Sequence, residues 1–130
     1  MKKAFIILTT VLFATMAQGQ TLTQQDLMGT WLVSNLENTN SNPKMASAMT
    51  DAVINLYADN SFEIKEKQQS GANYTYKTTT HKNATWSYNP STQTISTTRS
   101  KMELKITQTG GKTYFTDTDS GLKFEVTKPI

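Results

Sequence analysis

Few residues of this chain have the chemistry that catalysis needs. His81 is the single histidine, and there is no cysteine. Nucleophilic catalysis requires a base beside the nucleophile, and strand alternation places His81 opposite Tyr74 and Tyr76, facing solvent. The glutamates alternate with core residues, which disfavours a carboxylate pair for glycoside hydrolysis. We therefore predict no enzyme activity, no catalytic residues and no cofactor.

An acidic segment near the C-terminus has the initial spacing of a calcium-binding loop. Asp117, Asp119 and Gly121 provide that spacing. The segment lacks the third acidic position and the later bidentate glutamate of the EF-hand pattern. Asp, Ser and Gly are also ordinary turn residues, so we predict a hairpin turn here and no metal site.

Large aromatic side chains on alternating segments are the more informative set. Alternation predicts that they point inward, together with aliphatic neighbours. The expected interior ligand-binding residues are Phe62, Tyr74, Tyr76, Trp86, Tyr88 and Leu104. Apolar walls with a few hydroxyl groups are typical of ligand sites. An ordinary filled core would use the same residues, so both interpretations stay open at this point.

A helix is predicted in the longest connection between strands. Asn42 can cap it, and Pro43 suits the first helical position. Met45, Met49 and Ala52 then recur on one face. Met45 and Met49 join the candidate ligand-binding residues because a flexible thioether adapts to irregular ligands. The sequence leaves open whether this helix is a mobile lid or a fixed plug.

The N-terminus has the pattern of a secretory signal peptide. Lys2 and Lys3 precede an apolar run over residues 4–14, and Ala17 and Gly19 form a small-x-small cleavage site. We predict that residues 1–19 are removed and that residues 20–130 form one exported domain, periplasmic or secreted. With no cysteine after the cleavage site, the protein is not expected to be a lipoprotein.

The charge balance excludes two classes of partner. Lys2 and Lys3 account for two of the 13 basic residues, so the mature chain carries 11 basic and 10 acidic residues, a net charge of +1. The lysines are scattered, and Arg99 is the single arginine. Nucleic-acid-binding domains cluster their basic residues on one face. We therefore predict no nucleic-acid partner, and no membrane insertion after signal cleavage.

The periodicity of the mature chain predicts an all-β fold. Apolar residues alternate with polar ones over residues 101–107 and 122–127, and turn residues separate such segments. Strands spaced by roughly 8–12 residues are typical of a sandwich or barrel. Closure hides the apolar face and removes sheet edges. We predict a single antiparallel up-and-down β-barrel of about eight strands, with a helical turn before the first strand and a helix between the first two.

The order of the motifs resembles that of small bacterial exported lipocalin-like domains. The stretches that carry the resemblance are DLMGTW (26–31), LYADNSFEI (56–64), ATWSYNPSTQTIST (84–97), MELKIT (102–107) and LKFEVT (122–127). The resemblance implies that Trp31 closes the narrow end of a barrel, with Gly29 allowing a close backbone approach. Many lipocalins lay a cation across this tryptophan, and Arg99 and Lys128 are the candidates here.

Two functions follow from these patterns. The first is binding of a small, mainly hydrophobic molecule inside the barrel, beneath the methionine-bearing helix. The alternative is a filled barrel that acts through surface loops such as residues 38–42 or 68–73, as a protein-binding module or an inhibitor of an extracellular enzyme. A continuous cavity of about 300 Å³ or more would favour the ligand, and a packed interior would favour the surface.

Overall fold

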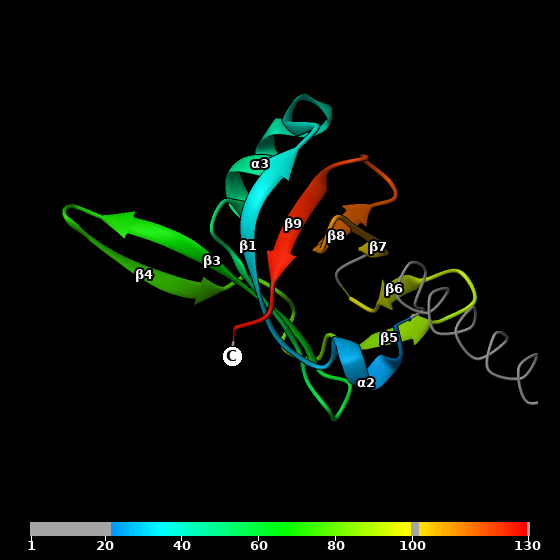
Figure 1. The fold of residues 1–130 in the computed structure, drawn as a ribbon. Coiled ribbons are helices and arrows are strands. Elements are labelled where there is room, and N and C mark those ends of the chain that lie inside the picture. The colour runs from blue at the N-terminus through cyan, green and yellow to red at the C-terminus, as the bar shows by residue number, and fades with distance from the viewer. Residues whose placement is uncertain (1–21, 100–101, 130) are drawn as a thin grey trace, which may run out of the picture.

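The computed structural model describes residues 22–99 and 102–129. The signal peptide predicted over residues 1–19 lies outside the described residues. Within them the chain is mostly β and forms one nine-stranded antiparallel sheet with two short α-helices (Figure 1). No helix in the described ranges is long and apolar enough to cross a membrane.

The elements follow the order that the turn residues predict. They are α2 (Gln24–Leu27), β1 (Gly29–Glu37), the 3₁₀ helix η1 (Thr39–Ser41), α3 (Pro43–Met49), β2 (Val53–Leu56), β3 (Phe62–Ser70), β4 (Asn73–Thr78), β5 (Trp86–Asn89), β6 (Thr94–Thr97), β7 (Glu103–Thr109), β8 (Lys112–Asp117) and β9 (Lys123–Thr127). The predicted helical turn before the first strand and the predicted helix between the first two strands are both confirmed.

The sheet has the order β4-β3-β2-β1-β9-β8-β7-β6-β5, in which neighbours are consecutive except where β1 pairs with β9. The antiparallel meander is thereby confirmed. The ladder is not closed, however, and it has nine strands rather than about eight. The prediction of a closed barrel is therefore wrong in that the end strands β4 and β5 do not pair with each other.

The sheet returns on itself at one point among the described residues, where the start of β3 meets the start of β5. An isolated bridge joins Ser61 to Thr85. Beside it, the Phe62 N–H donates to the Ala84 carbonyl at 2.9 Å, and the Trp86 N–H donates to the Asn60 carbonyl at 2.9 Å. Regular pairing stops there because β4 ends at Thr78, and residues 79–84 connect β4 to β5 as a loop that keeps only single hydrogen bonds to β3.

Trp31, Leu27 and Phe115 form a buried cluster beside α2, which we name the Trp31 floor. That Trp31 closes the narrow end of a barrel stays a prediction. The Trp31 indole N–H donates to the Leu27 carbonyl at 2.8 Å, and its ring lies 5.3 Å from that of Phe115. Lys128 Nζ lies 5.6 Å from the Trp31 ring centre, within cation–π range. Lys128 is thus the cation across the tryptophan, and Arg99 is not.

Gly29 makes the close approach on which this floor depends. Its φ is +124°, and a Cβ built there would lie 2.8 Å from Lys128 Cε. Lys128 Nζ also donates to the Asp26 carbonyl at 3.2 Å. Glycine is favoured here because a side chain would have an unfavourable backbone conformation and would require the flexible end of Lys128 to move.

Alternation correctly predicts the inward side chains of most strands. Phe62 and Ile64 are 3% and 4% exposed. The predicted inward residues of the last strands are buried in the same cluster, which includes Leu104, Ile106, Leu122, Phe124 and Val126. Trp86 is 2% exposed, and its indole N–H donates to the Tyr57 carbonyl at 2.9 Å.

Tyr74 and Tyr76 are the exception, and their predicted inward orientation is wrong. They are 57% and 45% exposed. Tyr76 pairs with Lys67 and Tyr74 with Gln69, so both tyrosines share the outer face of β3. The outer part of the β3–β4 hairpin, residues 66–77, projects away from the rest of the sheet as an arm (Figure 1).

Candidate functional site

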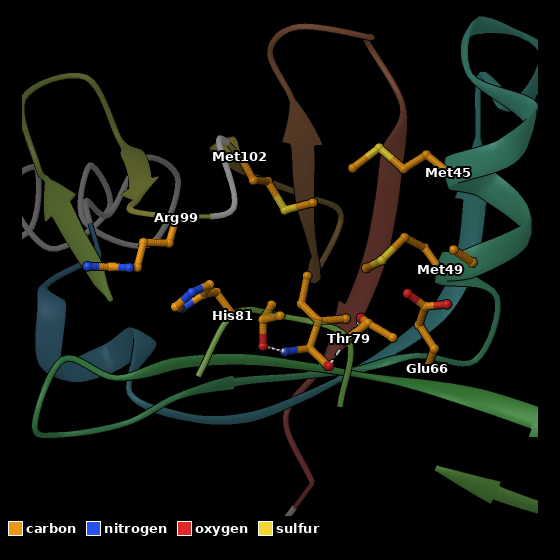
Figure 2. Close-up of a pocket in the computed structure, with 10 residues that line it drawn as sticks. Met45, Met49, Glu66, Thr79, His81, Arg99 and Met102 are labelled. Carbon is orange, nitrogen blue, oxygen red and sulfur yellow. Dashed lines mark hydrogen bonds between the residues drawn. The ribbon is translucent and has the colours of Figure 1, made fainter. Parts of the chain in front are cut away.

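The candidate site is a cleft between α3, β3 and the segment that leads into β7, which we name the α3 cleft (Figure 2). Its volume is about 240 Å³. The residues that line it are Met45, Ala48, Met49, Ile64, Glu66, Thr79, Thr80, His81, Arg99 and Met102. The cleft therefore joins an apolar, sulfur-rich wall to a polar rim.

Helix α3 forms the apolar wall, and its cap is the one that the sequence predicts. The Asn42 side chain accepts from the Met45 N–H at 3.1 Å, and Pro43 is the first helical residue. Ala46 and Met49 are 7% and 3% exposed within the core. One face of α3 is therefore packed into the core, and the half-buried Met45 lies at the edge of the cleft.

The floor is held by hydrogen bonds between β3 and the segment after β4. The Thr79 N–H donates to the Ile64 carbonyl at 3.0 Å. The Ile64 N–H donates to Thr80 Oγ1 at 3.3 Å. Both polar backbone groups of Ile64 are thereby satisfied, which fixes the loop against the strand and places Thr79 and Thr80 along the cleft.

The rim carries three groups of different charge character. His81 is exposed as predicted, and its Nδ1 accepts from the Asn83 N–H at 3.1 Å, which assigns the ring proton to Nε2. Arg99 has φ +64° and lies on the same side of the cleft as His81, whereas Glu66 lies on the α3 side (Figure 2). Neither Glu66 nor Arg99 has an ion-pair partner within residues 22–99 and 102–129.

The predicted ligand-binding residues divide into three groups. Met45 and Met49 line the α3 cleft. Phe62, Trp86 and Leu104 are packed in the core. Tyr74 and Tyr76 lie on the arm, outside any interior site.

Tyr88 has a separate position from these groups. It is half-buried against the core, and its hydroxyl has no hydrogen-bond partner among the described residues. Burial raises the pKa of Tyr88, and the charge of Asp26 adds to this effect. A buried tyrosine hydroxyl is expected to have a hydrogen-bond partner, and residues 22–99 and 102–129 provide none for Tyr88.

Several cleft residues were not predicted as functional. These are Glu66, Thr79, Thr80, Arg99 and Met102, together with His81, which was expected only to face solvent. The position of Met102 could have been predicted, because alternation places it on the same inward face as Leu104, two residues before that core residue. Glu66 comes from β3 and Arg99 from the segment after β6, and the loop over residues 79–84, which supplies Thr79, Thr80 and His81, has no periodic pattern.

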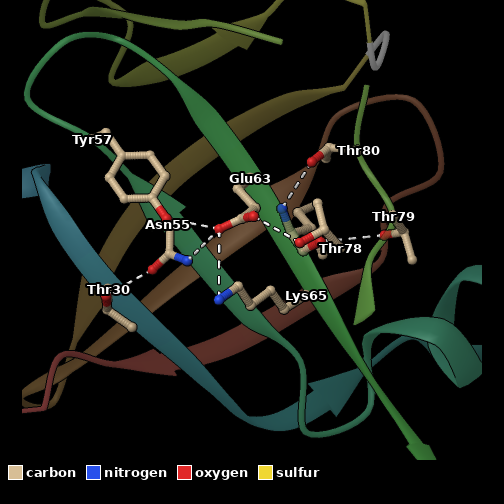
Figure 3. Close-up of polar contacts among 9 residues, drawn as sticks. Thr30, Asn55, Tyr57, Glu63, Lys65, Thr78, Thr79 and Thr80 are labelled. Carbon is tan, nitrogen blue, oxygen red and sulfur yellow. Dashed lines mark hydrogen bonds and ion pairs between the residues drawn. The ribbon is translucent and has the colours of Figure 1, made fainter. Parts of the chain in front are cut away.

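A row of polar groups crosses the outer face of β1, β2, β3 and β4 and centres on Glu63 (Figure 3). Glu63 Oε1 accepts from Asn55 Nδ2 at 3.0 Å and from the Tyr57 hydroxyl at 2.7 Å, and Oε2 accepts from the Thr78 hydroxyl at 2.7 Å. Asn55 Oδ1 accepts in turn from the Thr30 hydroxyl at 2.7 Å. This row ties four strands together.

Titration of the row follows from these contacts. Burial raises the pKa of Glu63, but the hydrogen bonds from Thr78, Tyr57 and Asn55 outweigh it, and the pKa is lowered overall. The hydrogen bond to the same carboxylate raises the pKa of Tyr57. Glu63 thus remains ionised as a structural acceptor, which indicates a stabilising role rather than proton transfer.

Two other polar features are occupied by contacts within the fold. Asp117 is 5% exposed, and its Oδ2 accepts from the Ser120 N–H at 3.1 Å and from the Ser120 hydroxyl at 2.7 Å, so the predicted hairpin turn is confirmed. A depression of about 330 Å³ lies beside β8 and β9. Its Lys112 and Glu125 pair with each other at 3.5 Å.

Comparison with known proteins gave no match: neither a protein-family model, nor a curated protein, nor a solved structure aligns significantly with this chain. The α3 cleft is therefore the feature from which a function can be inferred. The cleft offers thioethers, hydroxyls and single charged groups at its rim, which is a composition suited to binding.

Proposed function

We propose that this protein is an exported, lipocalin-like binding protein that holds a small, mainly hydrophobic molecule in the α3 cleft. The observation that carries the proposal is the convergence of Met45, Met49 and Met102 on one cleft (Figure 2). The curled sheet, in which the Ser61–Thr85 bridge joins the start of β3 to the start of β5, acts as the container. It is neither an enzyme nor a lipoprotein in this proposal.

The position of the ligand differs from the interior site that the sequence predicts. Phe62, Trp86 and Leu104 are 3%, 2% and 0% exposed and belong to one core cluster, so they are part of the packed interior and do not line a ligand site. The cleft volume of about 240 Å³ is below the roughly 300 Å³ that favours a ligand, and the interior is packed, so cavity volume favours the surface function and the ligand proposal depends on the methionine lining of the cleft. The proposed ligand is accordingly small and only partly enclosed, with its apolar body against the methionines.

The test uses the neutral fluorescent probe N-phenyl-1-naphthylamine and two variants of α3. Ala48 lines the cleft, whereas Ser47 is the next residue and is exposed. Ala48→Phe fills the cleft and is expected to weaken probe binding by at least about tenfold, a loss of ~1.4 kcal/mol. Ser47→Phe is the matched control and should bind the probe like the unaltered protein.

Probe binding that survives Ala48→Phe unchanged would move the site elsewhere, and absence of binding by the unaltered protein would reject the proposal. Circular dichroism of both variants shows whether the fold is retained. Native mass spectrometry of protein purified from its own source is the complementary measurement, because a retained natural ligand appears as added mass.

The exposed arm supports a second candidate function, in which the surface binds another protein. Tyr74 and Tyr76 have their rings 6.2 Å apart, edge to face, and Lys67 Nζ lies 4.2 Å from the Tyr74 ring centre. Exposed tyrosines are enriched at protein interfaces. A pull-down from the exported fraction tests this function. It is favoured if a partner binds the unaltered protein and the Ala48→Phe variant but does not bind the Tyr74→Ser/Tyr76→Ser variant.

A further inference from the structure

Methionines are concentrated in the α3 cleft, although other apolar residues could form an apolar wall equally well. The chain has six methionines, of which Met1 and Met16 fall in the predicted signal peptide. Met28 is the C-cap of α2, away from the cleft. The remaining three, Met45, Met49 and Met102, all line the cleft. The cleft therefore holds every methionine of the folded domain except one.

The helix α3 and a set of hydrogen bonds to Thr97 hold the backbone of the three methionines in place. Met45 and Met49 are one helical turn apart on α3 and project from the same face. Met102 faces them from the opposite wall (Figure 2). Its N–H donates to the Thr97 hydroxyl at 3.1 Å, and its carbonyl accepts from the Thr97 N–H at 3.1 Å and from the Thr97 hydroxyl at 2.7 Å.

The side chains combine this fixed placement with freedom at the sulfur. Met49 is 3% exposed, while Met45 and Met102 are half-buried and reachable from outside. A methionine side chain has three rotatable bonds, so its sulfur can adjust to a shared centre without moving the backbone. The half-buried Met45 and Met102 can therefore turn their sulfurs toward the packed Met49, around an object smaller than an organic ligand.

Thioether chemistry narrows the choice of that object. Methionine sulfur is a soft, uncharged donor that selects Cu(I) over hard cations such as Mg²⁺ and Ca²⁺. Three neutral donors suit a monovalent cation, because the cleft has only the Glu66 carboxylate to offset positive charge, opposed by Arg99. The chain has no cysteine thiolate that would capture the same metal elsewhere.

His81 does not complete the donor set. Its Nδ1 already accepts from the Asn83 N–H at 3.1 Å and its ring is exposed at the rim, so the proposed donor set consists of the three sulfurs. The arrangement is thus a three-sulfur site with an imidazole at its rim. This donor set also disfavours Cu(II), which prefers nitrogen and oxygen ligands.

We propose that the α3 cleft binds one soft monovalent cation, Cu(I), through the thioether sulfurs of Met45, Met49 and Met102. The proposal goes beyond binding of a hydrophobic molecule and does not depend on it. The two occupants would compete, because both use the same methionine wall. Metal binding would join α3 to the chain segment before β7.

The experiment uses Ag(I) as an air-stable substitute for Cu(I), with methyl-¹³C-methionine-labelled exported protein in chloride-free buffer. Ag(I) is expected to bind in a ratio of one per chain and to shift the methyl signals of Met45, Met49 and Met102. Met28 is the internal control and should not shift. Competition with bathocuproine disulfonate then measures the affinity for Cu(I) itself, and Zn²⁺ should produce no shift.

Variants separate coordination from hydrophobicity. The triple substitution Met45→Leu/Met49→Leu/Met102→Leu keeps the volume and apolar character of the wall, and such swaps are well tolerated. It is expected to lose at least about 100-fold in Ag(I) affinity, the upper end of the loss seen even for supporting residues of metal sites. Met28→Leu and His81→Gln should bind Ag(I) like the unaltered protein.

Equal shifts at all four methionines, several ions per chain, or full affinity in the triple variant would each overturn the metal site. Retention of N-phenyl-1-naphthylamine binding by the triple variant shows that the cleft is intact and keeps the two proposals distinguishable. Loss of probe binding in Ala48→Phe with Ag(I) binding preserved would likewise separate them.

Discussion

Replacing Gly29 by alanine tests the floor of the fold, because two separable effects meet at one position. The φ of Gly29 is +124°, and a backbone conformation of this kind costs an L residue about 1–3 kcal/mol. The added Cβ would also lie 2.8 Å from Lys128 Cε. We expect the flexible Lys128 side chain to move aside and to lose its contact with the Trp31 ring, an attraction of about 0.5–1 kcal/mol.

The expected loss is therefore about 2–4 kcal/mol for Gly29→Ala in the unaltered protein, compared with a typical domain stability of about 5–15 kcal/mol. In a Lys128→Ala background the clash is absent, and Gly29→Ala should cost only about 1–3 kcal/mol. The double-mutant cycle thus predicts a coupling of about 1 kcal/mol between the two sites.

Urea unfolding followed by tryptophan fluorescence measures all four proteins, with the slope of the transition expected to stay constant. A Gly29→Ala protein as stable as the unaltered one would refute the backbone conformation at this position. A full loss that is the same with and without Lys128 would instead refute the close approach, while leaving the conformational cost in place.

Three further predictions concern other parts of the fold. Trp31→Ala should cost about 3–5 kcal/mol in urea unfolding, because it removes the indole packed on Phe115; an unchanged midpoint would contradict its placement. The lowered pKa of Glu63 means that its stabilising effect is present above the unfolded-state pKa, about 4.3, and is lost as the pH falls through the folded-state pKa. Thermal unfolding from pH 7 to pH 3 should show Glu63→Gln less stable than the unaltered protein by about 1–2 kcal/mol at pH 7, with the difference shrinking in acid; a constant difference would count against the hydrogen-bonded carboxylate. Tyr88→Phe should leave stability unchanged or raise it by about 1 kcal/mol, because it removes a buried hydroxyl without a partner among the described residues; a clear loss in the same urea assay would reveal a hydrogen bond at that hydroxyl.

The sequence predicted the parts of the fold that depend on local patterns. Alternation of apolar and polar residues correctly oriented Phe62 and Leu104, because the side-chain period of a strand is two whatever its partner. Asn42 and Pro43 correctly marked the start of α3, since a helix cap is decided by neighbouring residues.

Features that depend on the pairing of distant strands were not predictable in this way. Tyr74 and Tyr76 alternate correctly with their neighbours, but alternation does not say which of the two sets faces the core. The register that pairs Tyr76 with Lys67 decides this, and it depends on the turn at residues 71–72. The α3 cleft escaped prediction for a similar reason, because Glu66, His81 and Met102 come together only through tertiary structure.

The inner face of β3 explains why the cleft lies where it does. Along this face the side chains change from Phe62 and Ile64, which are buried, to the half-buried Glu66 and the exposed Gln68. The core therefore ends between Ile64 and Glu66, and beyond that point the strand continues as the polar arm. Helix α3 covers this boundary, so its methionines meet an apolar floor on one side and charged groups on the other. A site at such a boundary can hold an apolar body while keeping its entrance open to solvent, which a filled interior does not allow.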